Sequence, residues 1–337
     1  MSPRPPVLPG TTGDPSRLER LGEWGYRTAS TLARRWEGAP QKLAGAFVVS
    51  VGNLEVGGSG KTPCVLWWAR ALHDRGADVA VVCRPWGPMT PSGASDEATL
   101  LAESLPAGTR LFVGRSKSAQ AARARAAGAT AVVVDDGFSH RALHRDLDLV
   151  LLDARRPFGN GHCLPAGPLR EPPETLARAD AVVLSRADRA DAQSRRRAHE
   201  QIRATGFGGP ILSARHRVVG IRDGDEVIPA AGLVVFCASG LARAGELAES
   251  ATAAGLCVRG AVEFPDHHAF TEVEWDGVKR QARALDARVL TTAKDAVRLA
   301  PEARRETLVL EIAWEWLEGD VDPDRWVDGL LPVPRAS

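Results

Sequence analysis

The sequence contains no apolar run of the roughly 18–20 residues that a helix needs to span a bilayer, so a membrane-spanning protein is not expected. Its five cysteines are scattered through 337 residues, odd in number and without a C-x-x-C pair. This usage argues against a disulfide framework or a cysteine-rich metal site and is typical of a reducing cytosol. A net charge of +1 gives no overall attraction to nucleic acid, so no nucleic-acid partner is expected. The first residues lack the pattern of a signal peptide, and no internal repeat is visible.

The most informative segment is 46–63, in which an apolar run leads into a glycine-rich turn and then a helical pattern. Backbone N–H groups of such a turn, together with the helix N-terminus, form an anion site. Lys61 is expected to reach the terminal phosphates, and the hydroxyl of Thr62 to hold Mg²⁺. Glu55 stands where the strict motif has its first glycine, so an ordinary glycine-rich turn is the alternative. The order of strand, Lys-Thr and helix favours a nucleoside triphosphate site.

Valine- and leucine-rich runs alternate with helical stretches rich in alanine and arginine after this turn. Such runs predict a parallel sheet covered by helices on both faces, with ligands at the carboxyl ends of the strands. The expected strands are 79–83, 111–113, 131–134, 147–152 and 181–184.

The pattern changes near residue 215, where Asp223-Gly224 predicts a hairpin between 218–222 and 226–228. A second α/β set follows, with expected strands 233–236, 258–262, 289–291 and 308–312. The sequence therefore predicts three parts: residues 1–44 as a disordered start and a helix, 45–215 as a P-loop NTPase-like core, and 216–330 as a smaller α/β lobe. A cleft between the two lobes is a natural place for a substrate.

Residues 16–36 have the pattern of an amphipathic helix. One face carries Leu18, Leu21, Trp24, Leu32 and Trp36, and positive charge surrounds it at Arg17, Arg20, Arg27, Arg34 and Arg35. Trp and Arg around an apolar face are typical of a helix on an anionic membrane surface. Taken alone, these residues favour the alternative, a helix packed on its own domain.

Asp135 and Asp136 follow the expected strand 131–134. In phosphate-loop enzymes an acid at such a strand end holds the Mg²⁺ that bridges the nucleotide phosphates. Two adjacent carboxylates also repel each other unless a cation is near. Aspartate is common after strands, but the upstream phosphate loop favours the metal role.

Two further segments offer phosphate contacts. His140 lies among basic residues just after the acids, although such residues in loops are often only solvated. Residues 157–173 form a long loop dense in glycine and proline, which offers Arg170 as a clamp on a transferring phosphoryl group, with Glu171 beside it. A structural connector is the alternative for this loop.

Asp96 is a candidate general base at the start of an expected helix, although the helix dipole alone explains an acid there. His267, in the segment 264–270 after an expected strand, is a candidate for proton transfer. Two histidines and an acid in this segment also suggest zinc, but no further ligand is visible nearby. Residues 185–188 weakly resemble the guanine-reading motif of GTPases, with two key positions different.

Together these motifs resemble the tetraacyldisaccharide 4'-kinase family of lipid A biosynthesis. The matching segments run in family order from about residue 45 to 300; they are 50–63, 96–97, 135–140, 145–147, 159–161, 164–172, Phe264 with 266–267, and 294–295. The family tolerates a residue other than glycine where Glu55 stands. The resemblance implies an ATP- and Mg²⁺-dependent kinase that transfers the γ-phosphate to the 4'-hydroxyl of an acylated glucosamine disaccharide 1-phosphate. It also implies peripheral attachment to the cytoplasmic face of the bacterial inner membrane through the N-terminal helix.

The resemblance implies a role for each matching residue. The implied nucleotide-binding residues are Glu55, Val56, Gly57, Gly58, Ser59, Gly60, Lys61 and Thr62. The implied catalytic residues are Lys61, Asp96, Asp135, Asp136 and His267, with Asp96 as the base and His267 as its partner. The implied metal ligands are Thr62, Asp135 and Asp136. The residues implied to contact substrate or phosphate are Glu97, His140, Arg170 and Glu171.

Some positions depart from the family pattern, among them Pro85 and a short segment between Gly87 and Asp96, so an altered acyl pattern or sugar is conceivable. Two rival hypotheses stay open. One is a nucleotide-switch protein, a GTPase or metallochaperone, and the other is an inactive paralogue that binds lipid. Nucleotide preference and release of ADP would distinguish them from a kinase.

Overall fold

The computed structural model describes residues 15–35, 39–58, 60–241, 243, 245–317, 322, 324 and 328. Within these residues the chain forms two compact units. The larger unit contains residues up to 84, residues 105–216 and residues from 314 onward, and the smaller unit contains 85–104 and 217–313. The predicted disordered start (1–15) lies outside the described residues except for Pro15, as do Trp36 and Ser59.

The larger unit is built on a parallel sheet with the strand order β7-β6-β5-β1-β4-β2-β3. The strands are β1 (Phe47–Asn53), β2 (Val79–Cys83), β3 (Arg110–Val113), β4 (Ala131–Asp135), β5 (Leu147–Asp153), β6 (Ala181–Ser185) and the first part of β7 (Ile211–Asp223). Strands β1, β2, β4, β5 and β6 are buried along almost their whole length. Burial on both faces is why these strands have continuous valine and leucine runs, and it confirms the predicted parallel sheet.

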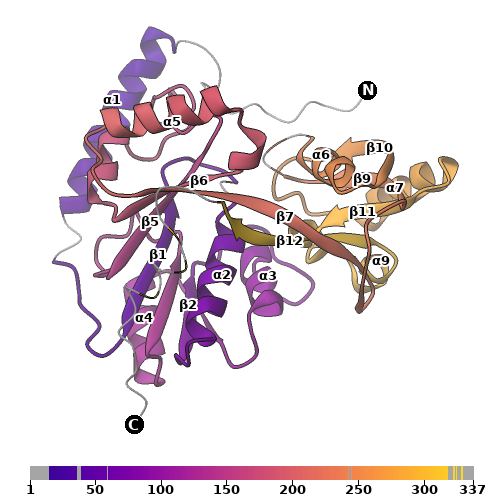
Figure 1. Ribbon diagram of the computed structural model, residues 1–337, viewed down its shortest axis with the longest axis horizontal. Coiled ribbons are helices and arrows are strands. Elements are labelled where there is room, and N and C mark those ends of the chain that lie inside the picture. The colour runs from indigo at the N-terminus through magenta and orange to yellow at the C-terminus, as the bar shows by residue number, and fades with distance from the viewer. Residues whose placement is uncertain are drawn as a thin grey trace. The chain divides into compact units, whose positions relative to one another are not determined.

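Helices flank this sheet (Figure 1). They are α1 (Arg17–Arg35), α2 (Lys61–His73), α4 (Lys117–Ala126) and α5 (Ala192–Ala204), with the short 3-10 helices η1 (Pro173–Arg178) and η2 (Ala187–Arg189). Helix α4 packs small residues, Ala121 and Ala124, against β2 and β4. Helix α2 contacts β1, β2 and β4 and buries Trp68 completely. The packing of α2 against the sheet fixes the position of the loop that joins it to β1.

The smaller unit has a parallel sheet in the order β10-β9-β11-β12. Its strands are β9 (Val234–Ser239), β10 (Cys257–Glu263), β11 (Arg288–Thr292) and the first part of β12 (Leu308–Trp316), and β8 (Glu226–Ile228) pairs with the end of β7 in the predicted hairpin. Its helices are α3 (Asp96–Ser104), α6 (Glu246–Ala253), α7 (Glu272–Ala284), α8 (Ala293–Ala296) and α9 (Pro301–Arg305). Helix α6 packs on one set of core residues and α7 on another, as expected of an α/β layer structure.

The division of the chain differs from the sequence-based boundaries in two places. Residues 85–104 belong to the smaller unit, where Glu103 of α3 pairs with Arg304 at 2.9 Å. The end of β12 belongs to the larger unit, where the ring of Trp316 meets that of Trp67 with centroids 5.2 Å apart. Both contacts join residues that are far apart in sequence, which is why no composition change marked them. Among the described helices, none is long and apolar enough to cross a membrane.

Candidate active site

The loop between β1 and α2 has the backbone geometry of a phosphate-binding turn. Gly60 immediately precedes α2 with φ 74°, a left-handed conformation that glycine adopts without strain. A Cβ atom at this position would lie 2.3 Å from Cε1 of His216, so a larger residue does not fit. The first N–H groups of α2 then face the loop with no partners within the helix, as an anion site requires.

Lys61, Asp136 and Arg170 meet beside this loop. The Nζ atom of Lys61 lies 3.6 Å from Oδ1 of Asp136 and donates to Oδ1 of Asn53 at 3.0 Å. Arg170 forms a bidentate ion pair with Asp136, with Nη1 and Nη2 at 2.9 and 2.8 Å from its two carboxylate oxygens. Three predicted site residues from different segments of the chain thus form one charged cluster.

Asp136 is held as a carboxylate. Burial opposes its ionisation, but Lys61 and Arg170 outweigh burial and place the pKa of Asp136 far below its usual range. Its backbone is left-handed, with φ 52°, and its N–H donates to the carbonyl oxygen of Val51 at 2.8 Å. Asp136 is therefore a fixed negative charge between cations that a phosphate group would also attract.

Asp135 has the opposite electrostatic character. It is the last residue of β4 and is 7% exposed, and its Oδ1 atom has no hydrogen-bond partner among the described residues. Burial raises the pKa of Asp135, and the charge of Lys61 opposes that rise. A buried carboxylate oxygen without a partner suits a hard cation such as Mg²⁺.

The donor set around Asp135 fits Mg²⁺ only together with a nucleotide. Within the described ranges, the chain offers no group of three or more His, Cys, Asp or Glu side chains that could hold a metal ion. Mg²⁺ bound with nucleotides commonly takes one or two carboxylates plus phosphate oxygens. Asp135 and the hydroxyl of Thr62, in the first turn of α2, match that requirement.

The remaining predicted residues of the larger unit have structural partners. His140 accepts the N–H of Ser118 through Nε2 at 3.3 Å. Glu171 is only 1% exposed, and its carboxylate lies 3.0 Å from Arg178 and 3.9 Å from Arg141. These ion pairs give Glu171 a structural role, and its contact with substrate stays a prediction.

Three residues of this cluster were missed by sequence reasoning. Asn53 binds Lys61 and also accepts from Arg170. Lys117 is buried and donates to the carbonyl of Asp136. Arg186 lies 3.7 Å from Asp153 and 3.4 Å from the carbonyl oxygen of Gly58 in the loop. Asn53 lay in the family-matching segment 50–63, and Arg186 lay in the weak resemblance of 185–188 to a guanine-reading motif; Lys117 carried no signal.

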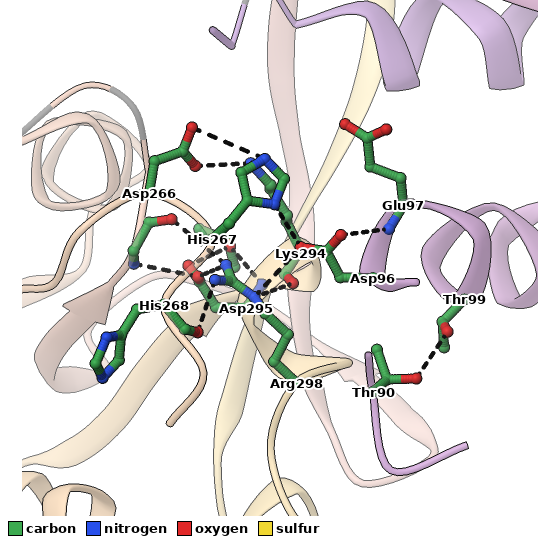
Figure 2. Close-up of polar contacts among 12 residues, drawn as sticks. Thr90, Asp96, Glu97, Thr99, Asp266, His267, His268, Lys294, Asp295 and Arg298 are labelled. Atoms are coloured by element: carbon green, nitrogen blue, oxygen red, sulfur yellow. Dashed lines mark hydrogen bonds and ion pairs between the residues drawn. The ribbon is translucent and has the colours of Figure 1, made fainter. Parts of the chain in front are cut away.

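The smaller unit contains a second cluster, built around Asp96 (Figure 2). Asp96 begins α3 and is fully buried. Its Oδ2 atom lies 2.8 Å from Nδ1 of His267, and its Oδ1 atom accepts the N–H of Glu97 at 2.8 Å. On the other side of the imidazole, Nζ of Lys294 lies 3.2 Å from Nε2 of His267 and donates to Asp266 at 2.8 Å. The structure thus brings the predicted acid and its predicted histidine partner together.

Arg298, which the sequence analysis overlooked, compensates the buried acids of this cluster. Its Nε atom lies 3.7 Å from Oδ2 of Asp96, and Nη2 donates to Oδ1 of Asp295. Burial raises the pKa of Asp295, and Arg298 opposes that rise. Arg298 also donates to the carbonyl of His268 at 2.9 Å, next to the predicted partner of Asp96. It therefore joins α8 to the loop that carries His267.

A parallel sheet whose first strand leads through a glycine-rich turn into a helix, with a lysine beside a strand-end aspartate, defines a P-loop nucleotide-binding protein. The family model described as Tetraacyldisaccharide-1-P 4'-kinase (LpxK) matches residues 23–330. The chain therefore belongs to this family.

Similar proteins extend along most of the chain. A tetraacyldisaccharide 4'-kinase of Anaeromyxobacter sp. (strain Fw109-5) is 44% identical over 287 residues, which cover 77% of this chain and 76% of that protein. One from Syntrophobacter fumaroxidans is 38% identical over 330 residues, covering 92% and 86%. The crystal structure of LpxK from Aquifex aeolicus, titled as an "apo" form in complex with ATP, has a TM-score of 0.67 and 24% identity, and covers 92% of this chain and 96% of that one. This last similarity supports the fold.

The charge balance around Arg298 yields a stability prediction. We expect Arg298→Met to lower the free energy of unfolding by about 3–5 kcal/mol, because it leaves buried carboxylates without a counter-charge. Adding Asp295→Asn should recover part of the lost free energy of unfolding, because a neutral amide then replaces one of the buried carboxylates. Chemical denaturation measures both effects.

The matched control is Arg304→Met, which removes a half-exposed ion pair with Glu103 in the same unit. Exposed pairs contribute at most about 1 kcal/mol. Equal destabilisation by the two arginine variants would contradict the role given to Arg298.

Proposed function

We propose that this protein is an ATP-dependent kinase that transfers the γ-phosphate to the 4'-hydroxyl of tetraacyldisaccharide 1-phosphate in lipid A biosynthesis. The observation that carries the proposal is the cluster of Lys61, Asp136 and Arg170 beside the phosphate loop, in a chain that belongs to the tetraacyldisaccharide-1-P 4'-kinase family. Family membership favours this function over a nucleotide-switch protein.

In the proposed reaction, residues 55–62 wrap the triphosphate, while Lys61 and Arg170 neutralise its charge. Phosphoryl transfer passes through a loose transition state, so placement and charge neutralisation supply most of the catalysis. Arg170 already lies within hydrogen-bond distance of Asp136. Its second role, as a clamp on the transferring group, requires the guanidinium to divide its donors between Asp136 and phosphate.

Mg²⁺ is the proposed cofactor, held by Asp135, Thr62 and nucleotide oxygens, with Asp136 beside them. When bound, it would neutralise charge that develops on the phosphates. The buried and partnerless Oδ1 atom of Asp135 supports this assignment. Asp136, already paired with two cations, better suits orientation of Lys61 and Arg170 than direct ligation.

Asp96 is the proposed base that accepts the proton of the attacking hydroxyl. The N–H of Glu97 and the ring of His267 fix one oxygen each, so the carboxylate is oriented before substrate arrives. His267 would steady the carboxylate as charge shifts during proton transfer, with Lys294 and Asp266 behind it. A weak base is sufficient because the transition state is loose.

The proposed location is the cytoplasmic face of the bacterial inner membrane, with α1 as the contact. Leu18, Leu21 and Trp24 are 81%, 65% and 68% exposed on this helix. Exposed arginines flank them at Arg17, Arg20 and Arg27. An apolar strip with basic flanks suits the interface of an anionic bilayer, where the acylated substrate also resides.

The direct test of the function is a transfer assay. Purified protein, labelled ATP and tetraacyldisaccharide 1-phosphate in mixed micelles should give labelled bisphosphate product and ADP in equal amounts. Lipid binding without ADP release would instead support the inactive paralogue, and selectivity for GTP would support the nucleotide switch.

Two substitutions test the phosphate cluster. We expect Lys61→Ala and Asp136→Ala each to lower kcat by about 10²-fold or more, because each removes a charge that positions or neutralises phosphate. Lys42→Ala, which changes an exposed lysine of the same unit, is the control and should retain wild-type turnover. Near-normal kcat in either cluster variant would contradict the assignment.

The base hypothesis predicts a pH effect. A protonated carboxyl group cannot accept a proton, so the wild-type pH–rate profile should have an acidic limb. Asp96→Asn should lower kcat by about 10²-fold or more and remove this acidic limb. Glu103→Gln, on the same helix, should leave the profile intact, and an unchanged profile in Asp96→Asn would exclude Asp96 as the base.

The exposed face of α1 predicts vesicle binding. The double variant Leu21→Ser/Trp24→Ser should weaken cosedimentation with phosphatidylglycerol vesicles by about tenfold or more, since each buried apolar side chain is worth roughly 1.5–3 kcal/mol. Added salt should weaken binding further by screening the arginines. Val273→Ser, at an exposed apolar site on α7, is the control; equal partitioning of all three proteins would contradict the proposed attachment.

A further inference from the structure

We propose that Glu23 and Tyr26 of α1 are positioning residues for the kinase site, because they hold the glycine- and proline-rich loop (157–173) that carries Arg170. The inference rests on the proposed function, in which Arg170 contacts the transferring phosphate. It gives α1 a second task, distinct from contact with a membrane.

The inner face of α1 makes three polar contacts with this loop, two through Glu23 and one through Tyr26. One carboxylate oxygen of Glu23 accepts the N–H of Cys163 at 2.8 Å, and the other lies 2.9 Å from Nδ1 of His162. One helical turn later, the hydroxyl of Tyr26 donates to the carbonyl oxygen of Arg170 at 3.2 Å. The helix therefore binds the loop near its middle and again at the arginine.

Burial distinguishes Glu23 from an ordinary surface glutamate. It is 8% exposed, whereas its neighbour Trp24 is 68% exposed. Burial opposes ionisation of Glu23, but the Cys163 N–H and His162 outweigh it and lower the pKa of this carboxyl group. Glu23 is thus a charged acceptor committed to the loop, since buried acids persist only when paired.

The loop transmits its position to the phosphate site through backbone hydrogen bonds. The N–H of Leu164 donates to the carbonyl of Leu169 at 2.9 Å, which closes the loop on itself. The N–H of Arg170 donates to Leu54 at 2.7 Å, and that of Val56 donates to Pro168 at 2.8 Å. A shift of the loop at Cys163 would therefore move both Arg170 and the start of the phosphate loop.

Close packing fixes the distance between α1 and the loop. A Cβ atom on Gly22 would lie 2.9 Å from Cγ of Pro165, whose ring cannot swing aside. A Cβ atom on Gly25, in the same helix, would meet nothing within 4 Å. The chain thus offers a matched pair of glycines, one against the loop and one in open space.

The test measures kcat and the KM for ATP in detergent micelles, where attachment to a bilayer is not required. We expect Glu23→Ala, Tyr26→Phe and Gly22→Ala each to lower kcat by about tenfold, because small misplacements of a phosphate ligand are costly. The KM for ATP should change much less, since residues 55–62 still bind the nucleotide. Glu23→Gln should recover part of the loss because its amide oxygen still accepts from Cys163, and Gly25→Ala should match the wild type.

Thermal unfolding and calorimetric binding of MgATP separate the possible failures. A wild-type protein that binds MgATP but phosphorylates no lipid would overturn the proposed function. The inference would then be read from faster amide hydrogen exchange at Cys163 and Arg170 in Glu23→Ala than in Gly25→Ala, because the Cys163 N–H loses its acceptor. Wild-type kcat in Glu23→Ala and Tyr26→Phe would overturn the inference. The inference would also be overturned if kcat returned to the wild-type value at assay temperatures well below the unfolding temperature, because the loss would then reflect unfolding. Equal losses of kcat in Gly22→Ala and Gly25→Ala would overturn it as well.

Discussion

The structure of the phosphate site depends on compensation of one negative charge, that of Asp136. Lys61, Arg170 and Lys117 approach it from three different segments, and Lys61 and Arg170 hold the pKa of this carboxyl group well below its usual range. The same cations are the groups that a triphosphate needs. In the proposed function Asp136 therefore keeps these cations together before the nucleotide binds, and such preorganisation lowers the cost of reorganisation during the reaction.

The smaller unit also surrounds an acid, Asp96, with basic residues. Asp96 is fully buried; its carboxylate lies 2.8 Å from Nδ1 of His267 and 3.7 Å from Nε of Arg298. Here the counter-charges leave the acid oriented by hydrogen bonds from both sides, a suitable arrangement for accepting a proton. In the proposed function one cluster holds phosphate and the other supplies a base, and each acid has its own basic neighbours.

Helix α1 has two faces of different character. Its outward positions are apolar with basic flanks, and its inward positions carry a glycine, a buried acid and a tyrosine hydroxyl that fit the loop of Arg170. The helical period places Glu23 and Trp24 in opposite environments although they are adjacent in sequence. Packing on its own domain and the proposed contact with a membrane use different faces of such a helix, so the two are compatible.

The sequence by itself determined the parallel α/β fold, the phosphate loop, the strand-end acids and the pairing of Asp96 with His267, the last through family resemblance. These features are readable because local order along the chain, strand then turn then helix, has a fixed physical meaning. Only the tertiary structure decided the partners: Arg298 beside Asp96, Lys117 and Asn53 at the phosphate cluster, Glu23 against Cys163, and the membership of 85–104 in the smaller unit. Charge compensation in a folded protein acts over ångströms between segments that are far apart in sequence, so no local pattern records which cation will balance which acid.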